Sequence, residues 1–318
     1  MTGRSARTGR TTDMEKVEYF GQPNCLKLSN QTAEVIVTTD IGPRIIRYGF
    51  VGADNLLGEV PDTVVQTEHG EWRPWGGHRL WHAPEAIPRT YVPDNTPVEY
   101  EALADNSVRL VQPVEGPTGI QKTLTVTLNA EGTRVTVGHK LTNCNAWPVE
   151  LAVWGLTIMN GSGGGTVIVP QEPYRSHDDY LLPARPMVLW HYTDLNDPRW
   201  TFGSKHLRLA VNETLTEPQK VGVANKQGWA AYAHAGRLFI KRFPYLEGAT
   251  YPDGGCNCET YTAGSFVEIE TIGPMTSLAP GESAEHVERW QVFKGVELGE
   301  TDDEIDAALK PLLRAEQA

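Results

Sequence analysis

The sequence predicts an all-β fold, an antiparallel sandwich or barrel with one short helix near its C-terminal end. From residue 33 onward, short runs of alternating apolar and polar residues are separated by turn residues. Residues 122–128 and 134–141 alternate around the turn sequence Asn-Ala-Glu-Gly, which is typical of a β-hairpin. Glycine (31) and proline (22) are abundant among the 318 residues, as many turns require. No amphipathic helices separate the runs, which argues against a doubly wound parallel sheet.

The other predicted strands follow the same alternation along the chain. Residues 33–39 and 44–50 flank a turn that contains Gly42 and Pro43. The later strand candidates are 149–158, 166–169, 207–212, 229–234, 237–242, 265–272 and 286–293. Because the sequence shows no fixed-period repeat and no clear linker, we expect one large β domain over 14–296, preceded by a disordered tail at 1–13.

The last segment, 297–318, is expected to be a helical extension. Thr301 and Glu304 have the spacing of a capping box, in which the hydroxyl and the carboxylate bond to free amides of the first helical turn. The apolar residues that then share one helix face are Ile305, Ala308, Leu309, Leu312 and Leu313. Pro311 is expected to kink or shorten this helix.

The chain is acidic, with 28 Lys and Arg residues against 40 Asp and Glu and a formal net charge of −12. We therefore expect neither nucleic acid nor a membrane surface as a partner. No window reaches 18 uninterrupted apolar residues, and the polar first ten residues lack the apolar core of a signal peptide. Four cysteines make a poor disulfide framework, and Cys256 and Cys258 are expected to be buried thiols rather than metal ligands. A cytoplasmic location is therefore expected.

Aromatic and polar residues concentrate between residues 71 and 95. Residues 72–82 contain three tryptophans, two histidines and two arginines, which is an unusual composition for a core segment. Flat aromatic rings beside forked donors and carboxylates suit a sugar, which has apolar faces and a rim of hydroxyls. The alternative is a long loop pinned by stacked Trp and Arg. The candidate ligand-contacting residues are Trp75, His78, Arg79, Trp81, His82, Glu85, Arg89, Asp94 and Asn95.

A metal site is the alternative for two of these histidines. On a helix, His78, His82 and Glu85 would share a face and could hold a divalent ion. Pro84 disfavours a helical conformation at the preceding residue, so hydrogen bonding to a polar ligand is the preferred interpretation, and neither a metal nor a cofactor is expected.

A second polar cluster lies between residues 241 and 261. Its candidate site residues are Lys241, Asp253, Asn257 and Glu259, the last near the mouth of a predicted strand. Glu268 and Glu270 share one face of the next strand, where a solvated face is the favoured interpretation. His139 is in phase with apolar neighbours and is expected to be a hydrogen-bonded core residue.

Three stretches carry a resemblance to a known superfamily. They are DIGPRIIRYGFVGADNLL at 40–57, GGHRLWHAPE at 76–85 and YPDGGCNCET at 251–260. Over about residues 18–295 the sequence resembles the galactose-mutarotase-like superfamily, which includes the aldose 1-epimerases, and in particular a bacterial branch of unknown function that bears the last two motifs. The resemblance implies a large antiparallel β-supersandwich. It also implies a substrate-binding Arg and a His within residues 75–82, and it carries the catalytic base of the epimerases over onto Glu259.

The sequence departs from the epimerase pattern at one point. The epimerases place an acid histidine after a hairpin similar to 122–147, whereas residues 152–157 here read Ala-Val-Trp-Gly-Leu-Thr. We therefore expect epimerase-like acid–base chemistry on a small-molecule sugar, with Glu259 as base, His78 or His82 as acid, and Arg79 and Arg89 holding ligand oxygens. The alternatives are a non-catalytic sugar-binding protein and a metal-assisted sugar lyase or hydrolase. The sequence leaves the oligomeric state open.

Overall fold

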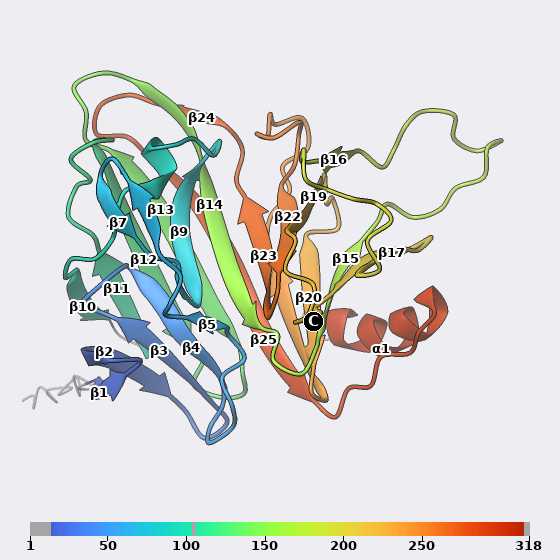
Figure 1. Cartoon of the computed structure of the whole chain (residues 1–318), viewed down its shortest axis with the longest axis horizontal. Coiled ribbons are helices and arrows are strands. Elements are labelled where there is room, and N and C mark those ends of the chain that lie inside the picture. The colour runs from blue at the N-terminus through green and yellow to red at the C-terminus, as the bar shows by residue number, and fades with distance from the viewer. Residues whose placement is uncertain (1–13, 104–105, 315–318) are drawn as a thin grey trace, which may run out of the picture.

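Two large antiparallel sheets face each other across an apolar core (Figure 1). The computed structural model describes residues 14–103 and 106–314. The expected disordered tail at 1–13 and the last four residues of the expected helical extension lie outside the described residues.

The first sheet carries the polar segments singled out in the sequence. Within the described residues it has eleven strands, ten of them in one continuous order. That order is β1 (Glu15–Tyr19), β2 (Gln22–Ser29), β3 (Ala33–Thr38), β4 (Arg44–Phe50), β9 (His78–Ala83), β14 (Val149–Asn160), β23 (Phe266–Ile272), β22 (Cys258–Ala263), β19 (Gln219–Val223) and β16 (Met187–Leu189). The remaining strand, β24 (Thr276–Leu278), pairs with β14.

The second sheet has ten strands within the described residues. Their order is β10 (Glu99–Leu103), β11 (Ser107–Val111), β12 (Ile120–Leu128), β13 (Val135–Asn143), β25 (Ser283–Lys294), β21 (Arg237–Arg242), β20 (Trp229–His234), β15 (Thr166–Pro170), β18 (His206–Ala210) and β17 (Trp200–Phe202). Along β12 and β13 every second side chain is buried, as the alternating sequence requires for a sheet with one face on the core.

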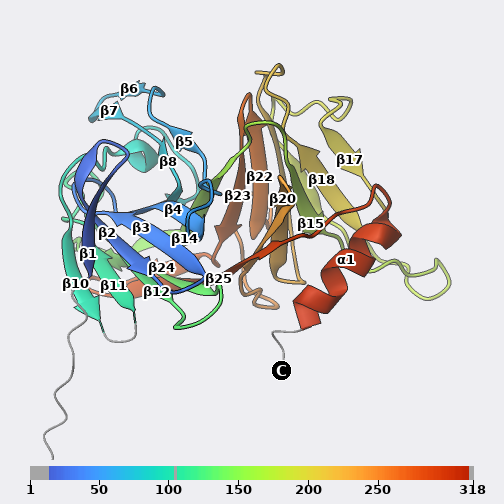
Figure 2. The ribbon, with the colours of Figure 1, turned by 90° about the horizontal axis from the view of Figure 1, so that it is seen from below.

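Two small sheets and a 3-10 turn lie between β4 and β10 in the chain. One small sheet pairs β5 (Glu59–Val60) with β8 (Trp75–Gly76), and the other pairs β6 (Val65–Thr67) with β7 (Gly70–Trp72). The turn η1 spans Arg89–Tyr91. In Figure 2 these two small sheets lie above β4 and β14, at one side of the first sheet.

The helix α1 spans Asp302–Arg314 and packs on the outer face of the second sheet (Figure 2). The expected capping box is present, since Thr301 N donates to Glu304 Oε2 at 3.0 Å and Glu304 N donates to Thr301 Oγ1 at 3.3 Å. Ile305 and Leu309 are buried against Trp229 and its neighbours. The helix continues past Pro311, which therefore does not shorten it.

The predicted all-β antiparallel architecture is confirmed, and the predicted strands coincide with observed ones to within a few residues. The main difference lies at 78–83, which is a central strand rather than a loop or a helix. None of the helices in the described part of the chain is long and apolar enough to span a membrane.

Candidate functional site

The strand β9 divides the motif residues between two faces of the first sheet. Arg79 and Trp81 point away from the second sheet, and Trp81 packs with Trp72 and Trp154. His78, Leu80 and His82 point toward the second sheet, as the period of two in a strand requires. The two histidines expected to be catalytic therefore lie on the opposite face from the arginine expected to bind substrate.

The outward face of β9, β14, β23, β22 and β19 forms a cavity of about 410 Å³, which we call the carboxylate pocket. Its charged lining residues are Arg79, Glu85, Lys220, Glu268 and Glu270. Aromatic side chains form much of its wall, among them Trp72, Trp81, Tyr91, Trp154, Trp190 and Tyr192. Residues of β5, β6 and β7 close one side of it. A concave site with aromatic walls and a few converging polar groups is the usual form of a small-molecule site.

Arg79 and Glu268 form a buried ion pair inside this pocket. Both terminal nitrogens of Arg79 donate to Glu268 Oε1 at 3.2 Å. The guanidinium lies 4.7 Å from the centre of the Trp81 ring and 5.8 Å from that of Trp72, within the range of cation–π attraction. The stacking and the ion pair together fix the position of the Glu268 carboxylate.

Lys220 bridges two further carboxyl groups. Its Nζ lies 2.8 Å from Glu259 Oε2 and 3.0 Å from Glu270 Oε2. Trp154 Nε1 also donates to Glu270 Oε2, at 3.0 Å. Glu270 Oε1 is buried and has no hydrogen-bond partner within the described residues. A ligand atom that bonds to this oxygen would satisfy an otherwise unpartnered polar group.

Burial and the neighbouring charges shift the pKa values of Glu259, Glu270 and Lys220. Burial raises the pKa of Glu270 to about 8, and the nearby Glu259 and Glu268 carboxylates add to the rise against the opposing effect of Lys220. Burial also raises the pKa of Glu259. Burial alone would lower the pKa of Lys220, but its two carboxylate partners raise that pKa well above the ordinary value. The raised pKa favours the protonated form of Glu270 at neutral pH, and Oε1 is the oxygen left for the proton because Oε2 already accepts hydrogen bonds from Lys220 and Trp154.

His78 belongs to a polar cluster between the two sheets, formed by His78, His139, Thr157, Lys241 and Glu288. His78 Nδ1 contacts Thr157 Oγ1 at 2.8 Å, and Lys241 Nζ lies 2.5 Å from the same oxygen and 3.1 Å from Glu288 Oε1. His139 Nδ1 donates to a backbone carbonyl at 3.0 Å, so its Nε2 accepts the hydrogen bond from His78 Nε2 at 2.6 Å. Burial lowers the pKa of both imidazoles, in agreement with neutral rings. The expectation that His139 is a hydrogen-bonded core residue is confirmed.

One group of side chains in this inter-sheet cluster has its potential metal-ligand atoms close together. Within the described residues, His78, His139 and Glu288 form one group whose potential ligand atoms all lie within 4.8 Å of one another. Those atoms are hydrogen-bonded to one another, to Thr157 or to Lys241. His82 and Glu85, which the metal-assisted alternative combines with His78, do not belong to this group.

His82 lies in a separate buried ion-pair site. Its Nε2 is 3.6 Å from Glu115 Oε2, and Lys122 Nζ is 2.5 Å from Glu115 Oε1. Burial opposes ionisation of Glu115, but the attraction of Lys122 and the contact with His82 lower the pKa of Glu115 to about 2. His82 thus contacts a salt bridge between the sheets rather than the carboxylate pocket.

The remaining expected site residues are distributed around the pocket. Trp75 Nε1 donates to Asn95 Oδ1 at 3.3 Å, and neither residue lines the pocket. Asp94 accepts from Arg44 Nη2 at 2.6 Å. Arg89 donates to the Pro84 carbonyl. The contacts of Asp94 and Asn95 join the loop that follows β9 to β4 and to β8.

Three further expected residues are Glu85 and two residues that precede β22 in the chain. Glu85 is at the pocket rim, where Tyr91 donates to it. Burial raises the pKa of Asp253, which lies near Glu259. Asn257 is fully buried and pairs with the backbone of Asn225, with Asn225 N at 2.6 Å from its Oδ1. Cys256 and Cys258 are free and buried, as expected.

Several pocket residues were not expected from the sequence. The sequence favours a solvated face for Glu268 and Glu270, yet the two side chains are 6% and 0% exposed. Lys220 and Trp154 were not singled out, although Trp154 falls within the segment 152–157 that the epimerase resemblance marks as lacking its histidine. The sequence signal for a buried carboxyl pair was the spacing of Glu268 and Glu270, two positions apart in an otherwise largely apolar strand.

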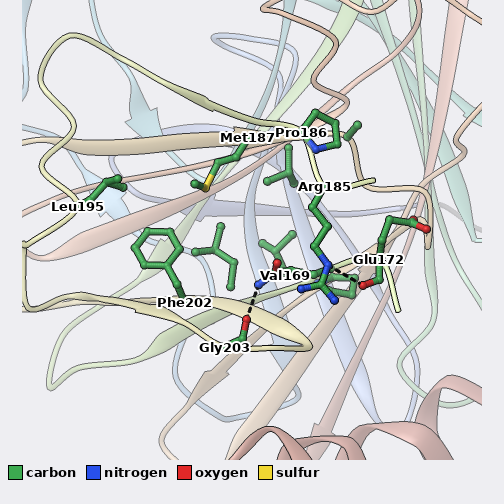
Figure 3. A pocket seen from close by; sticks show the side chains of 13 residues that line it. Val169, Glu172, Arg185, Pro186, Met187, Leu195, Phe202 and Gly203 are labelled. Atoms are coloured by element: carbon green, nitrogen blue, oxygen red, sulfur yellow. Dashed lines mark hydrogen bonds between the residues drawn. The ribbon is translucent and has the colours of Figure 1, made fainter. Parts of the chain in front are cut away.

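A second hollow, of about 320 Å³, lies between β15, β16, β17 and β18 (Figure 3). Val169, Met187, Leu195 and Phe202 contribute apolar walls to it. At its rim Arg185 Nε donates to the Glu172 carbonyl at 2.9 Å. None of its lining residues lines the carboxylate pocket, and it offers no pair of carboxyl groups.

Comparison with known proteins identifies the fold. The sequence matches no protein-family model and no curated protein. The structure is similar to that of the Slr1438 protein from Synechocystis sp. PCC 6803, with a TM-score of 0.58 and 11% identity over 88% of this chain and 100% of that chain. It is also similar to a putative mutarotase, YeaD, from Salmonella typhimurium, with a TM-score of 0.56 and 11% identity over 85% of this chain and 90% of that one.

A third similar structure is a galactose mutarotase-like protein from Lactobacillus casei ATCC 334. Its TM-score is 0.53 and its identity is 12%, over 85% of this chain and 100% of that chain. The chain therefore has the galactose mutarotase-like fold, as the resemblance in sequence implied. At this level of identity the similarity concerns the fold.

Proposed function

We propose that the carboxylate pocket binds a sugar and interconverts its two anomers by acid–base catalysis. The observation that carries the proposal is the pair of buried carboxyl groups on one face of β23. Glu268 is ion-paired with Arg79, whereas Glu270 holds a proton on an unpartnered oxygen. Two carboxyl groups in such different environments are suited to the roles of base and acid. The fold shared with mutarotase-like proteins supports the same function.

The two carboxyl groups perform complementary proton transfers. Glu268 takes the proton of the anomeric hydroxyl, and Glu270 gives its proton to the ring oxygen, so the bond between that oxygen and the anomeric carbon breaks. Rotation of the aldehyde and the reverse transfers then close the ring in the other configuration and restore both groups. Positions two apart on a strand are separated by about 7 Å, which hydrogen bonds of about 2.6–3.2 Å to the two sugar oxygens can bridge.

Lys220 supports this pair from within the pocket lining, and Glu259 supports it from behind the lining. Glu259, which the resemblance implies as the base, does not line the pocket but lies 2.8 Å from Lys220 Nζ. Lys220 in turn donates to Glu270 Oε2. We assign Glu259 the role of positioning Lys220, which keeps the Glu270 proton on the opposite oxygen.

The test compares wild type with Glu270→Gln by NMR exchange between sugar anomers over a panel of aldoses. Glutamine keeps the shape of the side chain but has no acidic proton, so exchange should fall by about 10²-fold or more while binding is retained. Wild-type exchange should also fall as the pH rises through about 8, because Glu270 then loses its proton. Glu285→Gln, at an exposed position on β25, is the matched control and should leave exchange unchanged. Wild-type exchange no faster than in buffer for every aldose would overturn the proposal.

A second candidate is sugar binding without chemistry. The aromatic wall supports it, because stacked rings bind sugars with no need for an acid or a base. If this alternative holds, Trp81→Ala abolishes sugar binding, and the wild-type protein does not accelerate anomer exchange for any sugar. Glu270→Gln then changes only the sugar affinity.

A further inference from the structure

The carboxylate pocket holds more acidic than basic groups. Within its described lining, the carboxyl side chains are Glu85, Glu268 and Glu270, and the cationic ones are Arg79 and Lys220. Behind the lining, Glu259 shares Lys220 with Glu270. The surrounding wall is largely aromatic, so water screens these charges less than at an open surface. With Glu270 protonated, Arg79 is paired with Glu268 and Lys220 with Glu259, so the unbalanced negative charge of the described lining is that of Glu85 at the rim.

Both cations of the lining are already paired. Arg79 gives both terminal nitrogens to Glu268 and stacks on Trp81. Lys220 contacts two carboxyl groups, and its Nζ lies 4.7 Å from the centre of the Trp190 ring. A phosphate or carboxylate on a sugar would have to displace one of these buried partners. The remaining carboxylate would then be buried without a cation, which is costly.

The rim carboxylate, in contrast, has acceptor capacity left. Glu85 is exposed at the rim, and its Oε1 accepts one hydrogen bond, from the Tyr91 phenol. An ammonium group carries donors only and one positive charge, so it matches this rim and reduces the excess of negative charge.

We propose that the pocket takes an amino sugar, with the ring between the aromatic walls and the protonated amine paired with Glu85. The inference rests on the proposed function, since it assumes that the pocket binds a sugar, and it names the class of that sugar. A hexosamine with a free amine is preferred over a neutral hexose, an N-acetylated hexosamine, a sugar phosphate or a uronic acid. The N-acetylated sugar is the informative comparison, because it keeps the nitrogen and loses the charge.

The experiment measures binding and chemistry separately on the full chain. Glucosamine, galactosamine and mannosamine are compared with their N-acetyl derivatives, the parent hexoses and glucose 6-phosphate, at about pH 6.5, where the amines carry a proton. Calorimetry gives the dissociation constants and NMR gives the rates of anomer exchange. At least one free amine should bind about tenfold or more tightly than its N-acetyl derivative and its parent hexose.

Substitution of the rim carboxylate tests the assigned partner. Glu85→Gln keeps the size of the side chain and removes its charge, so the ratio of amine to neutral-sugar affinity should fall by about tenfold. Glu285→Gln removes the same net charge at an exposed site on β25 and should leave the ratio unchanged. An equal fall in both variants would show a general field effect and would overturn the assignment of Glu85.

The outcomes separate this inference from the proposed function. If neutral hexoses or glucose 6-phosphate bind as tightly as the amines and are exchanged, the amino-sugar inference fails and the proposed function stands. If amines bind preferentially and no sugar is exchanged, the inference stands and the proposed chemistry fails. If no sugar binds, both fail.

Discussion

Glu270 is the side chain on which both the proposed chemistry and the expected pH response depend. It is fully buried, it shares Lys220 with Glu259, and one of its oxygens has no partner within the described residues. Two carboxyl groups that share one ammonium, with the Glu268 carboxylate nearby, cannot both be ionised at low cost in such a place. The proton on Glu270 is the means by which the folded protein relieves that crowding.

This proton makes the stability of the fold depend on pH. A pKa raised to about 8 means that folded Glu270 binds its proton more tightly than unfolded Glu270, whose ordinary value is 4.5. The resulting stabilisation is complete below the ordinary value and is lost as the pH rises through about 8. Glu270→Gln should remove this loss, so that between pH 5 and 9 the variant should lose roughly 4 kcal/mol less unfolding free energy than wild type. Urea unfolding across that range measures the difference, and parallel pH curves for the two proteins would contradict the assignment.

The sequence predicted part of this arrangement. Alternation along β23 correctly placed Glu268 and Glu270 on the same face. It could not show that this face is covered by the small sheets and by residues around Trp190, which belong to distant parts of the chain. Lys220 gave no local signal, because its importance comes only from the two carboxyl groups that β22 and β23 bring to it.

The strand β9 shows why motif residues can mislead when they are taken as one site. Its six residues are all buried, and it lies between β4 and β14. Both faces of this strand are covered. His78 and His82 are polar, and their burial is stabilised by a hydrogen bond to His139 and an ion pair with Glu115. A mixed polar and aromatic run therefore does not look like a strand in the sequence. Once the strand is recognised, the period of two assigns Arg79 and Trp81 to the pocket.

The neighbouring strand β14 passes closely over the inter-sheet cluster at Gly155. A Cβ at this position would lie 2.7 Å from Glu288 Oε1 and 3.2 Å from His78 Cε1. Gly155→Ala should therefore lower the unfolding free energy by about 1–3 kcal/mol, because the buried cluster cannot move aside. Gly138→Ala on β13 is the control, since its Cβ would meet nothing nearer than Thr125 Cβ at 3.7 Å, and its effect should stay within about 1 kcal/mol of zero. Chemical denaturation of both variants tests the difference, and equal effects would contradict it.

The sequence predicts the all-β fold class of the two-sheet architecture, but it does not predict which strands pair with one another. Alternation located many of the longer strands but fewer than half of the strands in the described residues, and the resemblance implied the supersandwich. The adjacency of β9 to β14, or of β13 to β25, joins segments far apart in sequence and leaves no local trace. The same long-range pairing brings His78 from one sheet against His139 from the other. The inter-sheet cluster could therefore not be predicted from the sequence around His78 or around His139 alone.

The inter-sheet cluster also links the two sheets energetically. Lys241 and Glu288 belong to the second sheet, and Lys241 Nζ also donates to Thr157 Oγ1 and to the Ile269 carbonyl of the first sheet. Lys241 and Glu288 are both fully buried, so removing either charge leaves the other without its partner.

Lys241→Met should lower the unfolding free energy by about 3–5 kcal/mol, because Glu288 is then a buried carboxylate with no cation. The double variant Lys241→Met, Glu288→Gln removes both charges and should recover part of the loss, which a double-mutant cycle by urea unfolding measures. Lys27→Met is the control: Lys27 pairs with Glu15 at 2.6 Å at the surface, and its loss should cost at most about 1 kcal/mol. If the double variant is no more stable than Lys241→Met alone, the cost comes from lost packing of the lysine stem rather than from the unpaired charge. The two sheets would then be joined by their apolar core without a specific contribution from this ion pair.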